Sequence, residues 1–176
     1  RGEVHLQDST IRGLHKTQDG RLWVLGIDNL SDDAVIWERA GETWEPLEAW
    51  EGSGSAPLAI ASVAAAPLVL SAHSLTRFAA GEEPSSSWLS QPLELVGANM
   101  LLDRDEQTGL VAGRTARGEC KLYQIALETA EVEELSCPFT NATSFVRDES
   151  AAGDCFFAST SQRDVGPVVR RICRSD

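Results

Sequence analysis

Short apolar runs that follow a glycine or another turn residue recur along this chain at a nearly constant interval. The runs begin after Gly20, Ala66, Gly109 and Gly153, which are 46, 43 and 44 residues apart. Within each interval, further short segments rich in Val, Ile, Leu, Trp and Phe are separated by Gly, Asp, Asn, Pro and Ser. Such segments are typical of β-strands joined by tight turns. No segment keeps a period of 3.6 residues with helix caps, so we expect very little helix.

A repeat of this length made of short strands is the signature of β-propeller blades, each a four-stranded antiparallel meander. Four blades account for the 176 residues. We therefore predict a single all-β propeller domain with blades at about 8–50, 57–92, 95–137 and 139–176. The last blade lacks a strand, and the alternating N-terminal segment 3–7 belongs to no blade, so we expect this strand to complete blade four and close the ring. The alternative is four blades of a larger ring, completed by another chain or by a further segment.

The charge and the apolar runs exclude two classes of partner. The formal net charge is −12, with 27 acidic and 15 basic residues, which disfavours binding to the phosphates of nucleic acid. No apolar run approaches the ~20 residues needed to cross a bilayer, and the longest candidate, at 56–70, is interrupted by Pro57 and Pro67. The chain opens at Arg1 without Met, and we expect a processed or trimmed N-terminus.

The four cysteines all lie in the second half of the chain, at 120, 137, 155 and 173. The first pair is centred on a turn at 128–129 and the second on a turn at 163–166, so each pair is placed for a bridge across a hairpin. We predict the disulfides Cys120–Cys137 and Cys155–Cys173; the alternative is four buried free thiols. Disulfides indicate an oxidising compartment, periplasmic or extracellular. The sequence contains no Cys-x-x-Cys spacing, so we do not expect a zinc site.

Blade one carries DGRLWV at 19–24, followed by VIWERAGETW at 35–44. This pattern resembles the repeat of two-component-regulator-type sensor propellers and, more distantly, the Asp-box repeat of sialidase-like propellers. The resemblance implies that Asp-Gly forms the turn between the first two strands and that a Trp packs between adjacent blades. The other blades match only in outline, because the second has Ala-Ala-Pro in place of Asp-Gly and the third and fourth lack the Trp. The resemblance also implies a propeller used outside the cytoplasm, and it implies no catalytic residue.

The residue types that could carry catalysis are sparse. Tyr123 is the one tyrosine and lies in a predicted strand, so we expect a packed aromatic and not the nucleophile of a sialidase. His5, His15 and His73 are far apart and would converge only if all pointed at the propeller axis. The acidic loop at 28–33 could offer oxygen ligands to calcium, but it lacks EF-hand spacing and we expect a solvated hairpin loop. We predict neither an enzyme nor a cofactor or metal.

We therefore interpret the chain as an extracytoplasmic binding or assembly module, or a subunit of a larger complex, whose partner is another protein. We expect Trp23 and Trp37 to pack between blades and Trp44 and Trp50 to lie on an outer strand as a protein or sugar site. A carbohydrate-binding or glycan-active propeller is the alternative, favoured if Trp44, Trp50 and Trp88 share an exposed face. The funnel loops and outer tryptophans supply the candidate binding residues: Arg12, Asp28, Asp32, His73, Asn99, Arg117, Asn141, Arg163, Trp44 and Trp50.

Overall fold

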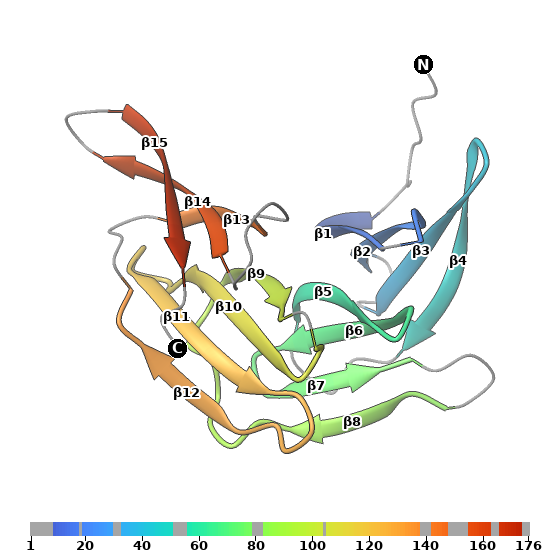
Figure 1. Ribbon diagram of the computed structural model, residues 1–176. Helices are drawn as coiled ribbons and strands as arrows, with labels where there is room; N and C mark the ends of the chain where they lie inside the picture. Colours follow the sequence, from blue (N-terminus) through green and yellow to red (C-terminus); the bar gives the residue numbers. More distant parts are fainter. Residues whose placement is uncertain are drawn as a thin grey trace. The chain divides into compact units, whose positions relative to one another are not determined.

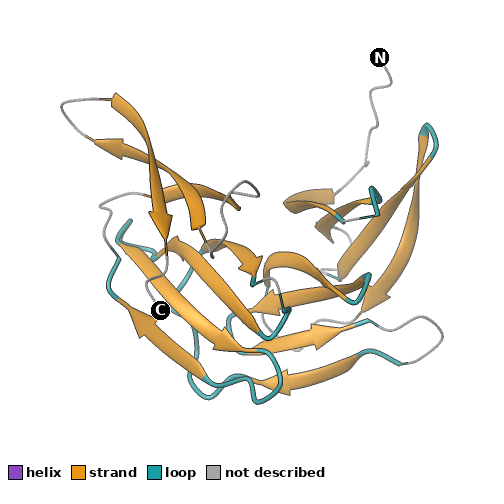
Figure 2. Cartoon of the chain, viewed as in Figure 1, coloured by secondary structure: helices purple, strands orange, loops and turns teal. Residues whose placement is uncertain are grey.

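The computed structural model describes residues 9–17, 19–29, 33–50, 56–78, 83–103, 105–137, 142–147, 155–162 and 166–173. These residues are strands, turns and loops without a helix (Figure 2), which confirms the all-β prediction. They accordingly contain no helix that could span a membrane. Their strands form four antiparallel sheets. The chain falls into two compact units, Arg1–Trp88 and Leu89–Asp176.

The first unit contains two four-stranded meanders, in which each strand pairs with the next strand of the sequence (Figure 1). The first sheet consists of β1 (Ser9–Lys16), β2 (Leu22–Asp28), β3 (Ala34–Ala40) and β4 (Thr43–Trp50). The second sheet consists of β5 (Pro57–Val63), β6 (Ala66–Ser71), β7 (Ser74–Arg77) and β8 (Ser85–Trp88). They lie where the repeat predicts blades one and two.

The strand β8 begins earlier than its turn-rich sequence predicts. Gly, Pro and Ser at 81–87 indicate a loop, yet Ser85 to Ser87 pair with β7. The Oγ1 of Thr76 and the Oγ of Ser86 lie 2.8 Å apart, so hydroxyl pairing across the strands compensates for the absent apolar side chains.

The core of the first unit lies between its two sheets, where β1 and β5 run against each other. Its buried cluster is shared by both sheets: Trp23, Leu25, Ile36, Ile60, Val69 and Phe78. Trp23 is fully buried, which confirms its predicted packing between adjacent repeats. The apolar residues of β2 and β3 that face the second sheet therefore supply the main contact between the two sheets.

The second unit holds a four-stranded sheet and a sheet with three described strands. The four-stranded sheet consists of β9 (Gly97–Leu102), β10 (Thr108–Arg114), β11 (Cys120–Ala126) and β12 (Val132–Leu135). The other consists of β13 (Ala142–Arg147), β14 (Cys155–Gln162) and β15 (Gly166–Cys173). The segment 3–7, which we expect to complete the last sheet, lies outside the described residues, so its pairing stays a prediction.

The positions of the cysteines agree with the hairpins that the sequence predicts. Cys120 and Cys137 form a disulfide across the β11–β12 hairpin, with their Cα atoms 6.2 Å apart, and pack against a small cluster around Ala112 and Leu122. Cys155 is also disulfide-bonded. The β14–β15 register places it directly opposite Cys173, the partner that the sequence predicts. The side chain of Cys173 lies outside the described part.

Gly113 on β10 marks a close approach of two strands. A methyl group there would lie 2.4 Å from the carbonyl oxygen of Gly97 on β9 and 3.0 Å from Cδ1 of Leu95. We expect Gly113→Ala to lower the free energy of unfolding by about 1–3 kcal/mol, because the backbone of β9 must move. Gly97→Ala is the matched control, since a methyl group there meets no atom within 4 Å. Chemical denaturation of both variants checks this, and equal stability would contradict the close approach.

Candidate functional site

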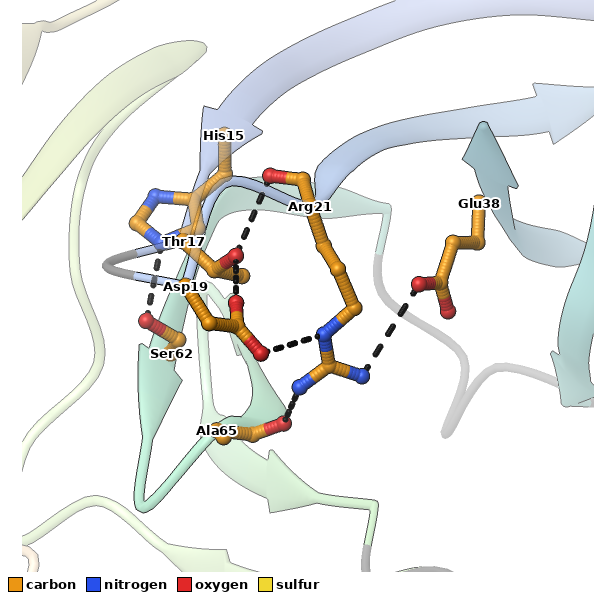
Figure 3. A network of polar contacts seen from close by, with 7 residues as sticks. All are labelled: His15, Thr17, Asp19, Arg21, Glu38, Ser62 and Ala65. Atoms are coloured by element: carbon orange, nitrogen blue, oxygen red, sulfur yellow. Dashed lines mark hydrogen bonds and ion pairs between the residues drawn. The ribbon is translucent and has the colours of Figure 1, made fainter. Parts of the chain in front are cut away.

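The β1–β2 turn carries a network of polar contacts that reaches the second sheet (Figure 3). Nε of Arg21 donates to Oδ2 of Asp19 at 2.9 Å, and Nη2 donates to the backbone carbonyl of Ala65 at 2.6 Å. Nη1 lies 3.8 Å from Oε1 of Glu38. The guanidinium also lies 5.3 Å from the centroid of the Trp23 ring, a cation–π distance. Arg21 thus ties the first sheet to the second at the edge of the buried cluster.

Local turn chemistry positions Arg21. The backbone N–H of Thr17 donates to the carbonyl of Arg21 at 2.9 Å, and Gly20 takes a left-handed φ of 90°. The Thr17 hydroxyl donates to Asp19, which with Arg21 lowers the pKa of that carboxyl below its usual value. The turn from Thr115 to Glu119 has the same backbone bonds, so the arrangement is a recurrent turn.

A second contact between the two sheets joins His15 and Ser62, whose Nε2 and Oγ atoms lie 3.0 Å apart. The imidazole also lies 5.9 Å from the Trp23 ring, and burial lowers the pKa of His15. Asp19 accepts hydrogen bonds from Thr17 and Arg21, and no described carboxylate bonds to His15. Among the described residues, no carboxylate therefore completes a catalytic triad with this serine and histidine, and we interpret the pair as an inter-sheet contact.

The lowered pKa of His15 predicts a pH-dependent stability. Below about pH 6.5 the unfolded chain binds a proton that the folded state resists, so the free energy of unfolding should fall as the pH decreases. Denaturation at about pH 7.5 and about pH 5.5 should show a smaller fall for His15→Asn than for the wild type. His73→Asn is the matched substitution at an exposed histidine. An unchanged pH dependence in His15→Asn would contradict the assignment.

Tyr123 is buried in β11, as its strand position predicts. Burial raises the pKa of its phenol, which therefore stays protonated at neutral pH. His73 is exposed and His5 lies outside the described residues. Within the described part of the chain, no group of three or more His, Cys, Asp or Glu side chains could hold a metal ion.

The predicted binding residues of the first unit are spread over both sheets. Arg12 is exposed at an irregularity of the β1–β2 pairing, and Asp28 ends β2 with its backbone N–H bonded to the carbonyl of Asp33. His73 lies in the bend between β6 and β7, and Trp44 is half-buried on β4. Arg12 and Asp28 lie on neighbouring strands, whereas His73 belongs to the other sheet.

Two predicted binding residues lie in the described part of the second unit. Asn99 is exposed on β9, and Arg117 is exposed in the β10–β11 turn, where its backbone N–H donates to Oγ1 of Thr115 at 3.2 Å. Asp32, Asn141 and Arg163 lie outside the described residues, and so does the side chain of Trp50. A funnel built from all these residues remains a prediction.

The first sheet has a second apolar face, opposite the one that carries Trp23. Residues paired across antiparallel strands point to the same side, and the pairs Ile11–Gly26, Leu14–Val24, Val24–Trp37 and Gly26–Val35 join this side. We call it the outer face, formed by Ile11, Leu14, Leu22, Val24, Val35, Trp37 and Trp44.

The outer face is partly uncovered. Ile11 is 59% exposed and Leu14 is 65% exposed, both on β1. Trp37 is half-buried with its ring over Gly26, where an added methyl group would lie 2.7 Å from Cζ3. Lys16 and Arg39 are exposed on the same side of the sheet, which Asp28 at the end of β2 shares. Sequence reasoning missed this face.

A second uncovered apolar surface lies on the β14–β15 hairpin. Phe157 pairs with Arg171, and Ser159 pairs with Val169, so the four side chains share one side. Phe157 is 39% exposed and Val169 is 69% exposed. We call this surface, formed by Phe157, Ser159, Val169 and Arg171, the hairpin face.

Comparison with known proteins identifies a fold and no family. No protein-family model matches the chain, and no curated protein matches it. The chain is similar to the crystal structure of a putative 6-phosphogluconolactonase from Bacteroides uniformis, with a TM-score of 0.55 and 11% sequence identity. The match covers 98% of this chain and 59% of that protein, so the chain spans about three fifths of its length. That protein is a lactonase-like β-propeller, and at this identity the likeness concerns the fold alone.

Proposed function

We propose that this chain is a β-propeller module that binds another protein, as a binding domain or as a subunit of an assembly, and has no catalytic role. The observation that carries the proposal is the outer face of the first sheet, where Ile11 and Leu14 are more than half exposed beside the buried Val24 and Val35. The propeller class is supported by the 44-residue spacing, the four-stranded meanders and the likeness to a lactonase-like propeller.

The composition of the outer face suits a protein partner. Exposed aliphatic side chains beside an aromatic residue, with polar residues at the rim, are characteristic of protein interfaces. A sugar site needs exposed aromatic rings together with convergent polar groups. Trp88 is 68% exposed, but Trp44 is half-buried and lies on the other sheet of the unit, so we do not carry the glycan alternative further.

We also propose that the module acts outside the cytoplasm. The Cys120–Cys137 bridge and the bonded Cys155 support this, because structural disulfides persist in oxidising compartments and are rare in the cytosol. Periplasmic and secreted locations both meet this condition.

The proposal is tested by the native mass of the tagged full chain in an extract of its own source. The wild type should migrate in a complex, and Ile11→Lys with Leu14→Lys should release it, because two charges replace apolar contacts at the interface. Val96→Lys is the matched control, since Val96 is 57% exposed and belongs to neither apolar face. Binding retained by the double variant would contradict the proposal.

A further inference from the structure

We propose that the outer face of the first sheet binds a further propeller sheet, which another polypeptide of the assembly contributes. The inference rests on the proposed function and names the chemistry of its partner. That partner is a four-stranded antiparallel sheet, packed on the first sheet as the first sheet packs on the second. The contact between the two sheets of the first unit is the template for it.

The two sheets of the first unit meet through unlike faces. The first sheet turns toward the second the side that carries Trp23 and Leu25. The second sheet meets it with the side on which Ile60 pairs with Val69, and Val69 pairs with Thr76. Sheets that meet through unlike faces make a head-to-tail contact, which can repeat from one sheet to the next.

The outer face of the first sheet holds the row of residues that is equivalent to this row of the second sheet. Its members pair in the same way across the first three strands: Leu14, Val24 and Trp37. In each sheet the row lies three residues from the last backbone-bonded pair of the first hairpin. That pair is Thr17 with Arg21 in the first sheet and Val63 with Ala66 in the second. The outer face is therefore the same side of the meander that the second sheet uses to receive the first.

The equivalent positions of the two sheets differ in exposure. Leu14 is 65% exposed, whereas Ile60 is 5% exposed in the cluster that both sheets share. Trp37 is half-buried, whereas Thr76 is 2% exposed. The row of the second sheet is buried because a sheet packs on it, so a sheet of the same kind is the partner that the outer face fits.

The likeness to a lactonase-like propeller leaves room for such a sheet. The match covers 98% of this chain and 59% of that protein, so about two fifths of that protein lies beyond the matched part. The four described sheets of this chain therefore correspond to part of a propeller of that fold. A further sheet on the outer face corresponds to some of the remainder.

The template predicts a small residue on the partner. A methyl group placed on Gly13 of the first sheet would lie 3.2 Å from Cγ2 of Ile60, so the facing strand leaves space for the isoleucine. Leu14 holds the position equivalent to Ile60. The partner should therefore carry glycine, alanine or serine opposite Leu14.

Lys16 predicts an acidic side chain on the partner. It holds the position equivalent to Ser62, whose Oγ lies 3.0 Å from Nε2 of His15 on the facing sheet (Figure 3). An ammonium group that a sheet covers needs a charged or hydrogen-bonding partner. Lys16→Glu should therefore weaken the contact about tenfold or more, because like charges then meet, and Lys16→Arg should preserve it.

The test is site-specific photo-crosslinking in the native assembly. The tagged full chain carries p-benzoylphenylalanine in place of Leu14 and is illuminated in an extract of its own source, and mass spectrometry then identifies the crosslinked peptide. The peptide should belong to another polypeptide built of strand repeats like those of this chain, and it should contain the small residue. Lys16→Glu should lower the yield of this product about tenfold or more, and Lys16→Arg should not. The same replacement at Val96, which belongs to neither apolar face, should not capture this peptide.

Four results would contradict these expectations. A peptide of this chain, from the same copy or a second one, would overturn the inference because the chain then covers its own outer face. A peptide from a polypeptide without such repeats would overturn the inference and keep the proposed function. The absence of any product from position 14 would overturn both. An unchanged yield for Lys16→Glu would overturn the acidic contact.

Discussion

Replacing Trp23 with alanine should lower the free energy of unfolding of the first unit by about 3–5 kcal/mol, the cost of a large cavity in a core. Trp23 is fully buried, and its ring contacts both sheets through the cluster that includes Leu25, Ile60 and Phe78. Arg21 and His15 also lose the ring beside which they lie. Urea denaturation followed by circular dichroism measures the loss, and a fall below about 1 kcal/mol would contradict a shared core.

Two variants separate the cavity from other effects of removing Trp23. The indole N–H of Trp23 is buried without a hydrogen-bond partner, so Trp23→Phe keeps most of the apolar volume and gives up no hydrogen bond. It should be clearly more stable than Trp23→Ala. Trp88 is 68% exposed, and Trp88→Ala should change stability by no more than about 0.5 kcal/mol.

Removing the Cys120–Cys137 bridge should lower the free energy of unfolding of the second unit by about 3 kcal/mol. The two cysteines are 17 residues apart, and a bridge over a loop of about that length restricts the unfolded chain by this amount. The double variant Cys120→Ala with Cys137→Ala isolates this bridge, because a reductant would also reduce the disulfide of Cys155. Chemical denaturation measures the change, and a variant as stable as the wild type would show that the bridge adds nothing to the hairpin.

Local sequence patterns predicted the sheets because each strand can be recognised from a few consecutive residues. The apolar runs after Gly20 and Gly109 became β2 and β10, and the Cys120–Cys137 pair was placed correctly because symmetry about a turn is a local property. The β5–β6 turn was harder to predict. It is made by Ala64 and Ala65 with φ of 48° and 62°, a conformation that usually selects Asn or Gly.

The candidate site was less accessible to sequence reasoning. Alternation along β1 shows which residues share a side, but not whether another element covers that side, so the exposure of Ile11 and Leu14 could not be anticipated. The funnel residues were chosen by loop position, and the described ones, such as Arg12, His73 and Arg117, lie on different sheets. Contacts between sheets depend on packing at long range, which a single sequence does not encode in any short window.

Hydroxyl-radical footprinting of the native assembly, compared with the protein dissociated by dilution, tests the central claim most directly. Oxidation of Ile11 and Leu14 should be strongly reduced in the assembly, while Val96 and Trp88 should react equally in both samples, because neither belongs to the outer face. Equal oxidation of Ile11 and Leu14 in the two samples would contradict the claim that this face binds a protein partner.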